Sequence, residues 1–175
     1  MSRIVYYDNG HREVGPQWPL PVTLPRETPL VTLPATVVGG IVTGAAYAAD
    51  DVVGQLFDIP VSCDYGTLRA VTISCLDVQS AEYDILLFDH SVTVPTDNAA
   101  FALAADHDRV KLVAVVKILA TDTVSLNSEV VGTKTVDIPF SVPNQMLYGV
   151  LTTQSSPNYS TADPIRLRFA IRQWA

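Results

Sequence analysis

Alternation of apolar and polar side chains dominates the chain from residue 47 onward. The stretch 165–172 reads IRLRFAIR, so every second side chain is apolar, as in a half-buried β-strand. Residues 68–76 alternate in the same way around Val71, Ile73 and Cys75. Further strands are predicted at 83–88, 133–140 and 146–152, and a buried strand at 110–119, where the run is almost continuously apolar.

Turn-forming clusters separate these runs, at 64–66, 95–98, 143–144 and 155–158. One helix of one or two turns is predicted within 98–108, because its alanines favour helix and Asp97 or Asn98 can cap its start. Short strands without long helices between them are typical of a sandwich or jelly roll, and less so of a closed barrel. The predicted fold is therefore all-β, an antiparallel β-sandwich of the jelly-roll kind over residues 46–175.

Residues 1–45 have a different composition and are predicted to form an extended, Pro-rich N-terminal arm. They hold six of the twelve prolines, which exclude a helix or a central strand. A weak repeat, LPVTLP at 20–25 and LVTLP at 30–34, indicates extended segments with one apolar side. The arm can be covered by its own domain or by a neighbouring subunit, or it can be a flexible linker. Its candidate interface residues are Trp18, Leu20, Leu24, Leu30, Val31 and Leu33.

Composition and charge narrow the classes of partner. Hydrophobic residues make up 48% of the 175 residues, enough for one core, and charged residues 17%. The net charge of −7, with only 11 basic residues, argues against nucleic acid as a partner. The sequence has neither a polybasic stretch nor a long apolar run, so no membrane partner is predicted. The first residues lack the apolar core of a signal peptide. Synthesis in the cytoplasm is expected.

Motifs of catalysis and metal binding are absent from the sequence. It contains no G-x-S-x-G, H-E-x-x-H, G-x-x-x-x-G-K-[ST] or G-x-G-x-x-G, so no enzyme activity, cofactor or metal is predicted. His11, His90 and His107 lack a second histidine at metal-ligand spacing. Whether the two cysteines, Cys63 and Cys75, form a disulfide is left open, because sequence does not give their separation.

The most distinctive local pattern is a row of arginines. Arg166, Arg168 and Arg172 lie in phase on one face of the predicted strand 165–172, in a chain of acidic composition. Two interpretations remain open: the arginines bind an acidic surface of a partner, or they lie on a solvated sheet face opposite cross-strand acids.

Several short motifs, in the same order, resemble a family of small structural proteins of tailed bacteriophages. They are YAADDVVG at 47–54, DILLFD at 84–89, DNAAF at 97–101 with KLV at 111–113, and LYGVL at 147–151 with PNY at 157–159. The resemblance covers roughly residues 45–172 and implies a β-sandwich module of the virion without catalytic residues. The Pro-rich start of the chain departs from the family's polar repeats, so the docking site of the arm stays open.

The resemblance is greatest to capsid decoration, or cement, proteins. It implies that the chain clamps neighbouring subunits of the major capsid protein on the capsid surface, as a symmetric dimer or trimer. One alternative is a tail, baseplate or fibre component. An alternative of another class is a jelly-roll carbohydrate-binding module for host adsorption, which needs aromatic and polar side chains on one concave face.

Overall fold

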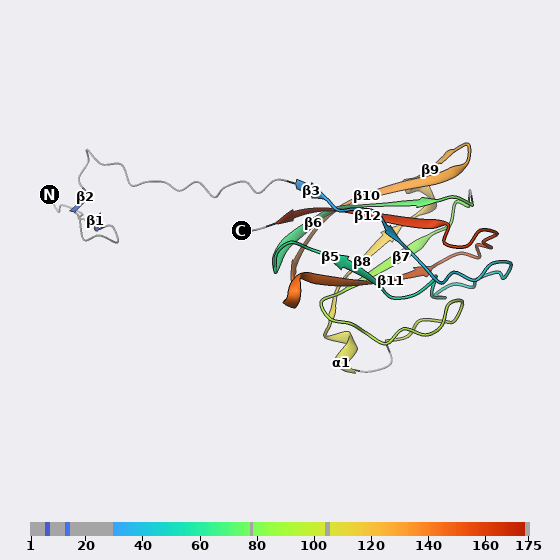
Figure 1. Cartoon of the computed structure of the whole chain (residues 1–175), viewed down its shortest axis with the longest axis horizontal. Coiled ribbons are helices and arrows are strands. Elements are labelled where there is room, and N and C mark those ends of the chain that lie inside the picture. Colours follow the sequence, from blue (N-terminus) through green and yellow to red (C-terminus); the bar gives the residue numbers. More distant parts are fainter. Residues whose placement is uncertain (1–5, 8–12, 15–29, 78, 104–105, 174–175) are drawn as a thin grey trace.

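The computed structural model describes residues 6–7, 13–14, 30–77, 79–103 and 106–173 (Figure 1). Two short strands, β1 (Tyr6–Tyr7) and β2 (Glu13–Val14), pair only with each other. The remaining strands form two antiparallel sheets. Short helical turns connect some of them, namely α1 (Asp106–Arg109), η1 (Ala120–Asp122) and η2 (Pro143–Gln145).

The first sheet, here called the β12 sheet, contains the arginine-bearing strand. In spatial order it consists of β3 (Leu30–Thr32) and β4 (Thr36–Val37), both paired with β12 (Ile165–Gln173), then β6 (Tyr65–Cys75), β10 (Glu129–Ser141) and β9 (Thr123–Leu126). The second, the β11 sheet, consists of β5 (Phe57–Pro60), β11 (Met146–Thr153), β7 (Tyr83–Phe88) and β8 (Leu112–Ile118).

The order of strands is that of a jelly roll. β3 and β4 together act as one strand interrupted at Pro34, and β9 is the hairpin partner of β10. The eight strands that result are then ordered 1-8-3-6 in the β12 sheet and 2-7-4-5 in the β11 sheet, so the chain crosses repeatedly from one sheet to the other. Two Greek keys folded into a double sheet have this arrangement. The prediction of an all-β, jelly-roll-like sandwich is confirmed.

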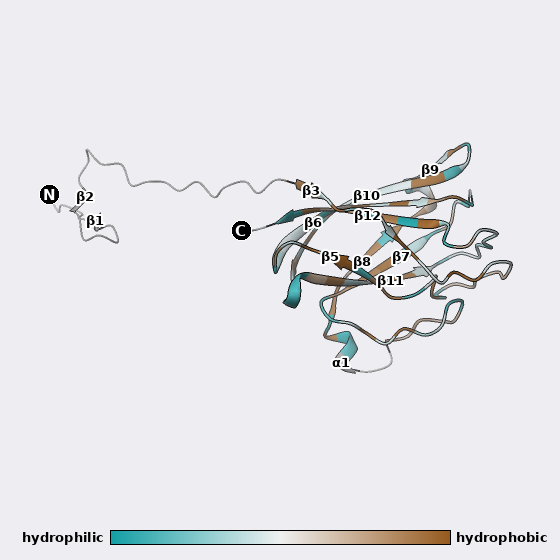
Figure 2. Cartoon of the chain, in the orientation of Figure 1, coloured by the Kyte–Doolittle hydropathy of each residue, from teal (hydrophilic) through white to brown (hydrophobic). Residues whose placement is uncertain are grey.

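The main core lies between the two sheets, and the strands hold most of the hydrophobic residues (Figure 2). The apolar half of each alternating run faces inward, as on β12, where Ile165, Leu167, Phe169 and Ile171 are all buried. The ring of Phe169 stacks on that of Phe57 across the sandwich, with centroids 6.4 Å apart. Alternation in sequence therefore becomes one continuous core because both sheets turn their apolar faces toward each other.

Two local predictions need correction. Of the helix predicted within 98–108, the structure shows a single turn at its end, α1, while Asp97 and Asn98 form a turn and Ala100 pairs with Asp51. Backbone pairing with a distant segment outweighs the weak helix propensity of alanine. The strand predicted as buried at 110–119 is β8, an edge strand, in which Val115 is 41% exposed. The strand is exposed because it lies at the border of its sheet, a position that the apolar run does not reveal.

Part of the predicted arm lies against the chain's own sandwich. The backbone N–H of Leu33 donates to the carbonyl of Phe169, and that of Val38 to the carbonyl of Ile165. Leu33 and Val38 are buried in the main core. Residues 30–45 are therefore covered by the chain's own domain. The domain division at residue 45 stays a prediction.

Candidate functional site: the open face of the β12 sheet

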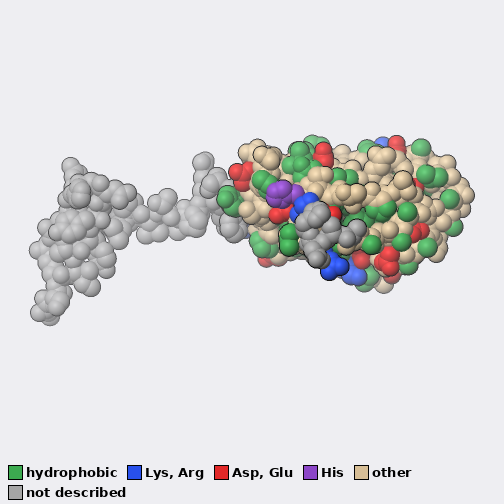
Figure 3. Space-filling model, turned by 90° about the horizontal axis from the view of Figure 1, so that it is seen from below, with side chains coloured by type: hydrophobic (Ala, Val, Ile, Leu, Met, Phe, Trp, Pro, Cys, Tyr) green, Lys and Arg blue, Asp and Glu red, His purple; other side chains and the backbone are tan. Residues whose placement is uncertain are grey.

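The two sheets differ in how their outer faces are covered. On the β11 sheet, the outward residues Val150 and Thr152 are almost fully buried. A second, smaller hydrophobic cluster covers them, formed by Val52, Phe88, Val92 and Val150 with partly buried neighbours from the loops. Seen from the side of the loop that carries α1, hydrophobic, acidic and basic side chains are intermixed over the surface (Figure 3). The chain thus covers much of one outer face with its own loops.

The outer face of the β12 sheet, here called the open face, carries the arginine row. Arg166, Arg168 and Arg172 are exposed, as their alternation with buried residues predicts. The structure therefore brings these three predicted residues together on one surface. Whether that surface binds a partner stays a prediction.

Hydroxyl-bearing residues, and not acids, lie next to the arginines on the neighbouring strand. Arg166 pairs in register with Ser74, and Arg168 with Thr72. One strand further, Thr133 lies opposite Thr72, with the two hydroxyl oxygens 3.0 Å apart. Thr72, Ser74 and Thr133 supply donors and acceptors but no charge.

The arginines of the row have no ion pair within the described part of the chain, where the ion pairs on this sheet are Arg69–Asp137 and Lys134–Asp122. Three guanidinium groups on an otherwise acidic protein are therefore left available for contact. This arrangement favours the partner interpretation over the solvated face with cross-strand acids.

A shallow hollow of about 350 Å³ lies on the open face between β4 and β10. Its lining comprises Ala35, Thr72, Ser74, Glu129, Val131, Arg166 and Arg168. Glu129 is its single acidic residue, against two arginines, so the hollow has a net positive charge. It fits a carboxylate or another small anionic group from a partner.

Exposed apolar side chains border the open face on both sides. Val37 on β4 lies opposite Arg166, and Leu30 on β3 lies opposite Arg172, where it is 56% exposed. At the other border, Val124 and Leu126 on β9 are 62% and 53% exposed. A positively charged centre with apolar margins is a surface suited to a protein partner.

The predicted arm residues fall in different places. Leu30 is exposed, Val31 is half-buried against the core, and Leu33 is buried. Leu33 is therefore a core residue of this chain. Trp18, Leu20 and Leu24 lie outside the described residues.

Sequence reasoning missed the neighbours of the arginines. Alternation over 68–76 placed Thr72 and Ser74 on the outer face of their strand, but nothing local indicated that this strand lies beside β12. The apolar margin on β9 was missed because residues 123–126 were not predicted as a strand.

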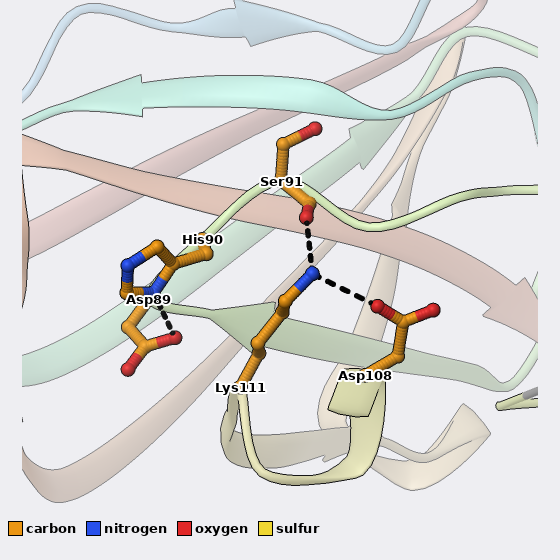
Figure 4. Close-up of polar contacts among 5 residues, drawn as sticks. All are labelled: Asp89, His90, Ser91, Asp108 and Lys111. Atoms are coloured by element: carbon orange, nitrogen blue, oxygen red, sulfur yellow. Dashed lines mark hydrogen bonds and ion pairs between the residues drawn. The ribbon is translucent and has the colours of Figure 1, made fainter. Parts of the chain in front are cut away.

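A second hollow, of about 320 Å³, lies at the start of β8 and β11. Its lining is Asp89, His90, Ser91, Lys111, Pro143, Asn144 and Tyr148. Lys111 Nζ donates to the carbonyl of Ser91 and to a carboxylate oxygen of Asp108, while His90 Nδ1 lies 2.8 Å from Asp89 Oδ1 (Figure 4). Three segments distant in sequence thus bring polar groups and one tyrosine ring to a concave spot.

A partly buried polar network ties the loops to the core. The carboxylate of Asp97 accepts hydrogen bonds from the Tyr47 hydroxyl at 2.6 Å and from the backbone N–H groups of Val42 and Gly54. The Tyr47 ring meets that of Tyr159 edge-on, with centroids 5.3 Å apart. Desolvation by burial, followed by the hydrogen bond to Asp97, raises the pKa of Tyr47 above its ordinary value. Asp97 therefore stabilises the loop structure.

A disulfide, a metal site and a membrane-spanning helix can each be looked for among the described residues. Cys63 and Cys75 are both free, and burial raises the pKa of the Cys75 thiol. No group of three or more His, Cys, Asp or Glu side chains there is placed to hold a metal ion. Among the same residues, no helix has the length and hydropathy needed to cross a membrane.

No protein-family model and no curated protein sequence matches this chain. Among solved structures, it resembles the coat protein of Tobacco streak virus, at 12% sequence identity and a TM-score of 0.35, over 88% of this chain and 92% of that chain. A TM-score of this size carries no conclusion about fold or function, so the jelly-roll assignment rests on this chain's own strand order.

Proposed function

We propose that this chain is a non-enzymatic structural protein of a bacteriophage particle, and specifically a decoration protein that binds the major capsid protein through its open face. The observation that carries the proposal is the contrast between the two outer faces. One is covered by the chain's own loops, while the other presents exposed arginines without an ion-pair partner among the described residues. The resemblance of its motifs to small virion proteins of tailed phages supports the same conclusion.

The chemistry of the open face indicates an acidic, partly apolar partner surface. Arginine binds carboxylates with two parallel hydrogen bonds, so Arg166 and Arg168 are suited to Asp or Glu side chains of a capsid subunit. The exposed valines and leucines at the margins add apolar contact area. A capsid repeats the same surface many times, so each contact can be modest when the chain itself is an oligomer.

The first experiment asks whether the chain is in the particle and where. Purified virions are analysed by mass spectrometry and labelled with gold-conjugated antibody to the chain. Label over the heads supports the decoration role. Label on the tail or at one vertex indicates a component of the tail, baseplate or fibre instead. Absence from the particle by both methods overturns the structural role.

The second experiment tests the open face. The double variant Arg166→Gln/Arg168→Gln loses two positive charges, and its binding to particles that lack the chain is measured. We expect the affinity to fall at least about tenfold, because each charge-assisted hydrogen bond contributes more than 1 kcal/mol. The matched control, Thr43→Glu/Ser156→Glu, lowers the net charge by the same amount at exposed loop positions. Equal binding by both variants contradicts a role of the open face.

The second hollow favours one alternative of another class, saccharide binding for host adsorption. Its lining combines a half-buried tyrosine ring with carboxylate, imidazole, amide and ammonium groups, and its volume of about 320 Å³ is at the small end of ligand sites. Such a site suits a single sugar ring. A glycan array tests it: saturable binding by the native chain that Asp89→Ala and Asn144→Ala each abolish supports this function, and no binding excludes it.

A further inference from the structure

β8 differs from the other border strands of the two sheets in having little protection against pairing. β3 has three residues and ends before Pro34, β5 has four and contains Asp58 and Pro60, and β9 has four. β8 has seven residues, LVAVVKI, without proline and with one charge, Lys117. Natural proteins protect border strands by shortness, proline and charge, so a long apolar border strand is a site for another strand.

Exposed apolar residues gather along this same border. Val115, at the centre of β8, is 41% exposed, and the residues just beyond the two ends, Val110 and Leu119, are 81% and 42% exposed. These are three of the large hydrophobic residues that are exposed among the described residues, and they lie within a stretch of ten positions. Within those residues, β7 is the neighbour of β8 in its sheet, so the other edge of β8 carries no strand.

From this border we infer that a second copy of the chain pairs with the first through β8, antiparallel and about a two-fold axis at Val115. The pairing joins the two β11 sheets into one continuous sheet. It goes beyond the proposed function, and either can be true without the other. An interface about a two-fold axis brings the same patch of both copies together, so it requires a self-complementary strand.

The sequence of β8 meets that requirement in this register. With Val115 opposite Val115 of the second copy, Leu112 lies opposite Ile118 and Ala114 opposite Val116, so apolar residues face apolar residues. Lys117 lies opposite Val113, which avoids a like-charge contact, and it keeps its ion pair with Asp84 at 3.3 Å. A register centred on Lys117 would place two ammonium groups opposite each other. Charge thus disfavours that register and is compatible with the one centred on Val115.

Pairing through β8 does not use the strands of the open face, because the open face belongs to the other sheet. The dimer then presents two open faces. Two linked binding surfaces raise the overall affinity for a repeating lattice without any new contact.

The test uses charge reversal at the two-fold axis, on the full chain, followed by sedimentation velocity over a range of concentrations. Directly opposite side chains in an antiparallel pair have Cβ atoms about 5 Å apart, so Val115→Lys and Val115→Glu each place like charges together. We expect each variant to raise the dimer dissociation constant at least about tenfold. An equimolar mixture of the two should dimerise again, because opposite charges then face each other.

The matched control is Val42→Lys, which adds a charge at an exposed valine of a loop, outside both β8 and the open face. It should sediment as the native chain does. Hydrogen exchange of the β8 amides should slow as the native chain is concentrated. A native chain that stays monomeric at all concentrations overturns the inference, as does native-like association of Val115→Lys or a mixture that associates no better than its parts.

Discussion

Tyr83→Phe should destabilise the fold by removing one hydroxyl from a buried pair. The hydroxyl oxygens of Tyr83 and Tyr159 lie 2.8 Å apart, and the two residues are 2% and 0% exposed. The substitution keeps the ring, so packing changes little, but the Tyr159 hydroxyl loses the hydrogen-bond partner that the described residues give it. An unsatisfied buried hydroxyl costs about 1–3 kcal/mol, so we expect the free energy of unfolding to fall by about 2 kcal/mol.

The reciprocal change, Tyr159→Phe, should cost less. The Tyr83 hydroxyl then keeps a contact with the Cys75 thiol, a weak hydrogen-bonding group. We expect a loss of about 1 kcal/mol for this variant and also only about 1 kcal/mol for the double variant, because replacing both partners leaves no unsatisfied hydroxyl. The coupling free energy is therefore about 2 kcal/mol.

Urea unfolding, followed by circular dichroism, measures these differences as shifts of the midpoint at constant slope. Tyr65→Phe is the control, because Tyr65 is 59% exposed and its change should leave stability unaltered. Single losses that add in the double variant, or a Tyr83→Phe variant as stable as the native chain, would refute a buried hydroxyl pair.

The remaining predictions concern pH, loop anchoring and packing. Desolvation raises the pKa values of Tyr47, Tyr83 and Tyr159 above the ordinary 10.0, so the stability they contribute is complete below pH 10 and falls as pH rises beyond it. Tyrosinate absorbance should therefore rise together with unfolding; ionisation of all seven tyrosines without unfolding contradicts this. Asp97→Ala removes the acceptor of three hydrogen bonds and should cost about 3 kcal/mol in urea unfolding, whereas a neutral result excludes the anchoring role. Gly149→Ala places a methyl group 2.1 Å from the Phe57 ring and should cost about 1–3 kcal/mol, with partial recovery in Phe57→Leu/Gly149→Ala; equal losses in both variants point to another cause.

Local periodicity determined which residues face the core. On β12, the alternation of Ile165, Leu167 and Phe169 with arginines needs only the two-residue repeat of an extended chain, so sequence predicts both the buried set and the exposed row. The sandwich followed from several such runs without long helices between them.

Only tertiary structure decided which strands are neighbours, because that depends on contacts between distant segments. Arg168 lies beside Thr72 and not beside an acid, a fact that neither strand contains by itself. Ala99 and Ala100 pair through their backbone with residues 51 and 52 and do not form the helix that their propensity favours. The apolar run of β8 is the same whether the strand lies at the centre or the border of a sheet, so its exposed edge at Val115 was decided by the order of strands alone.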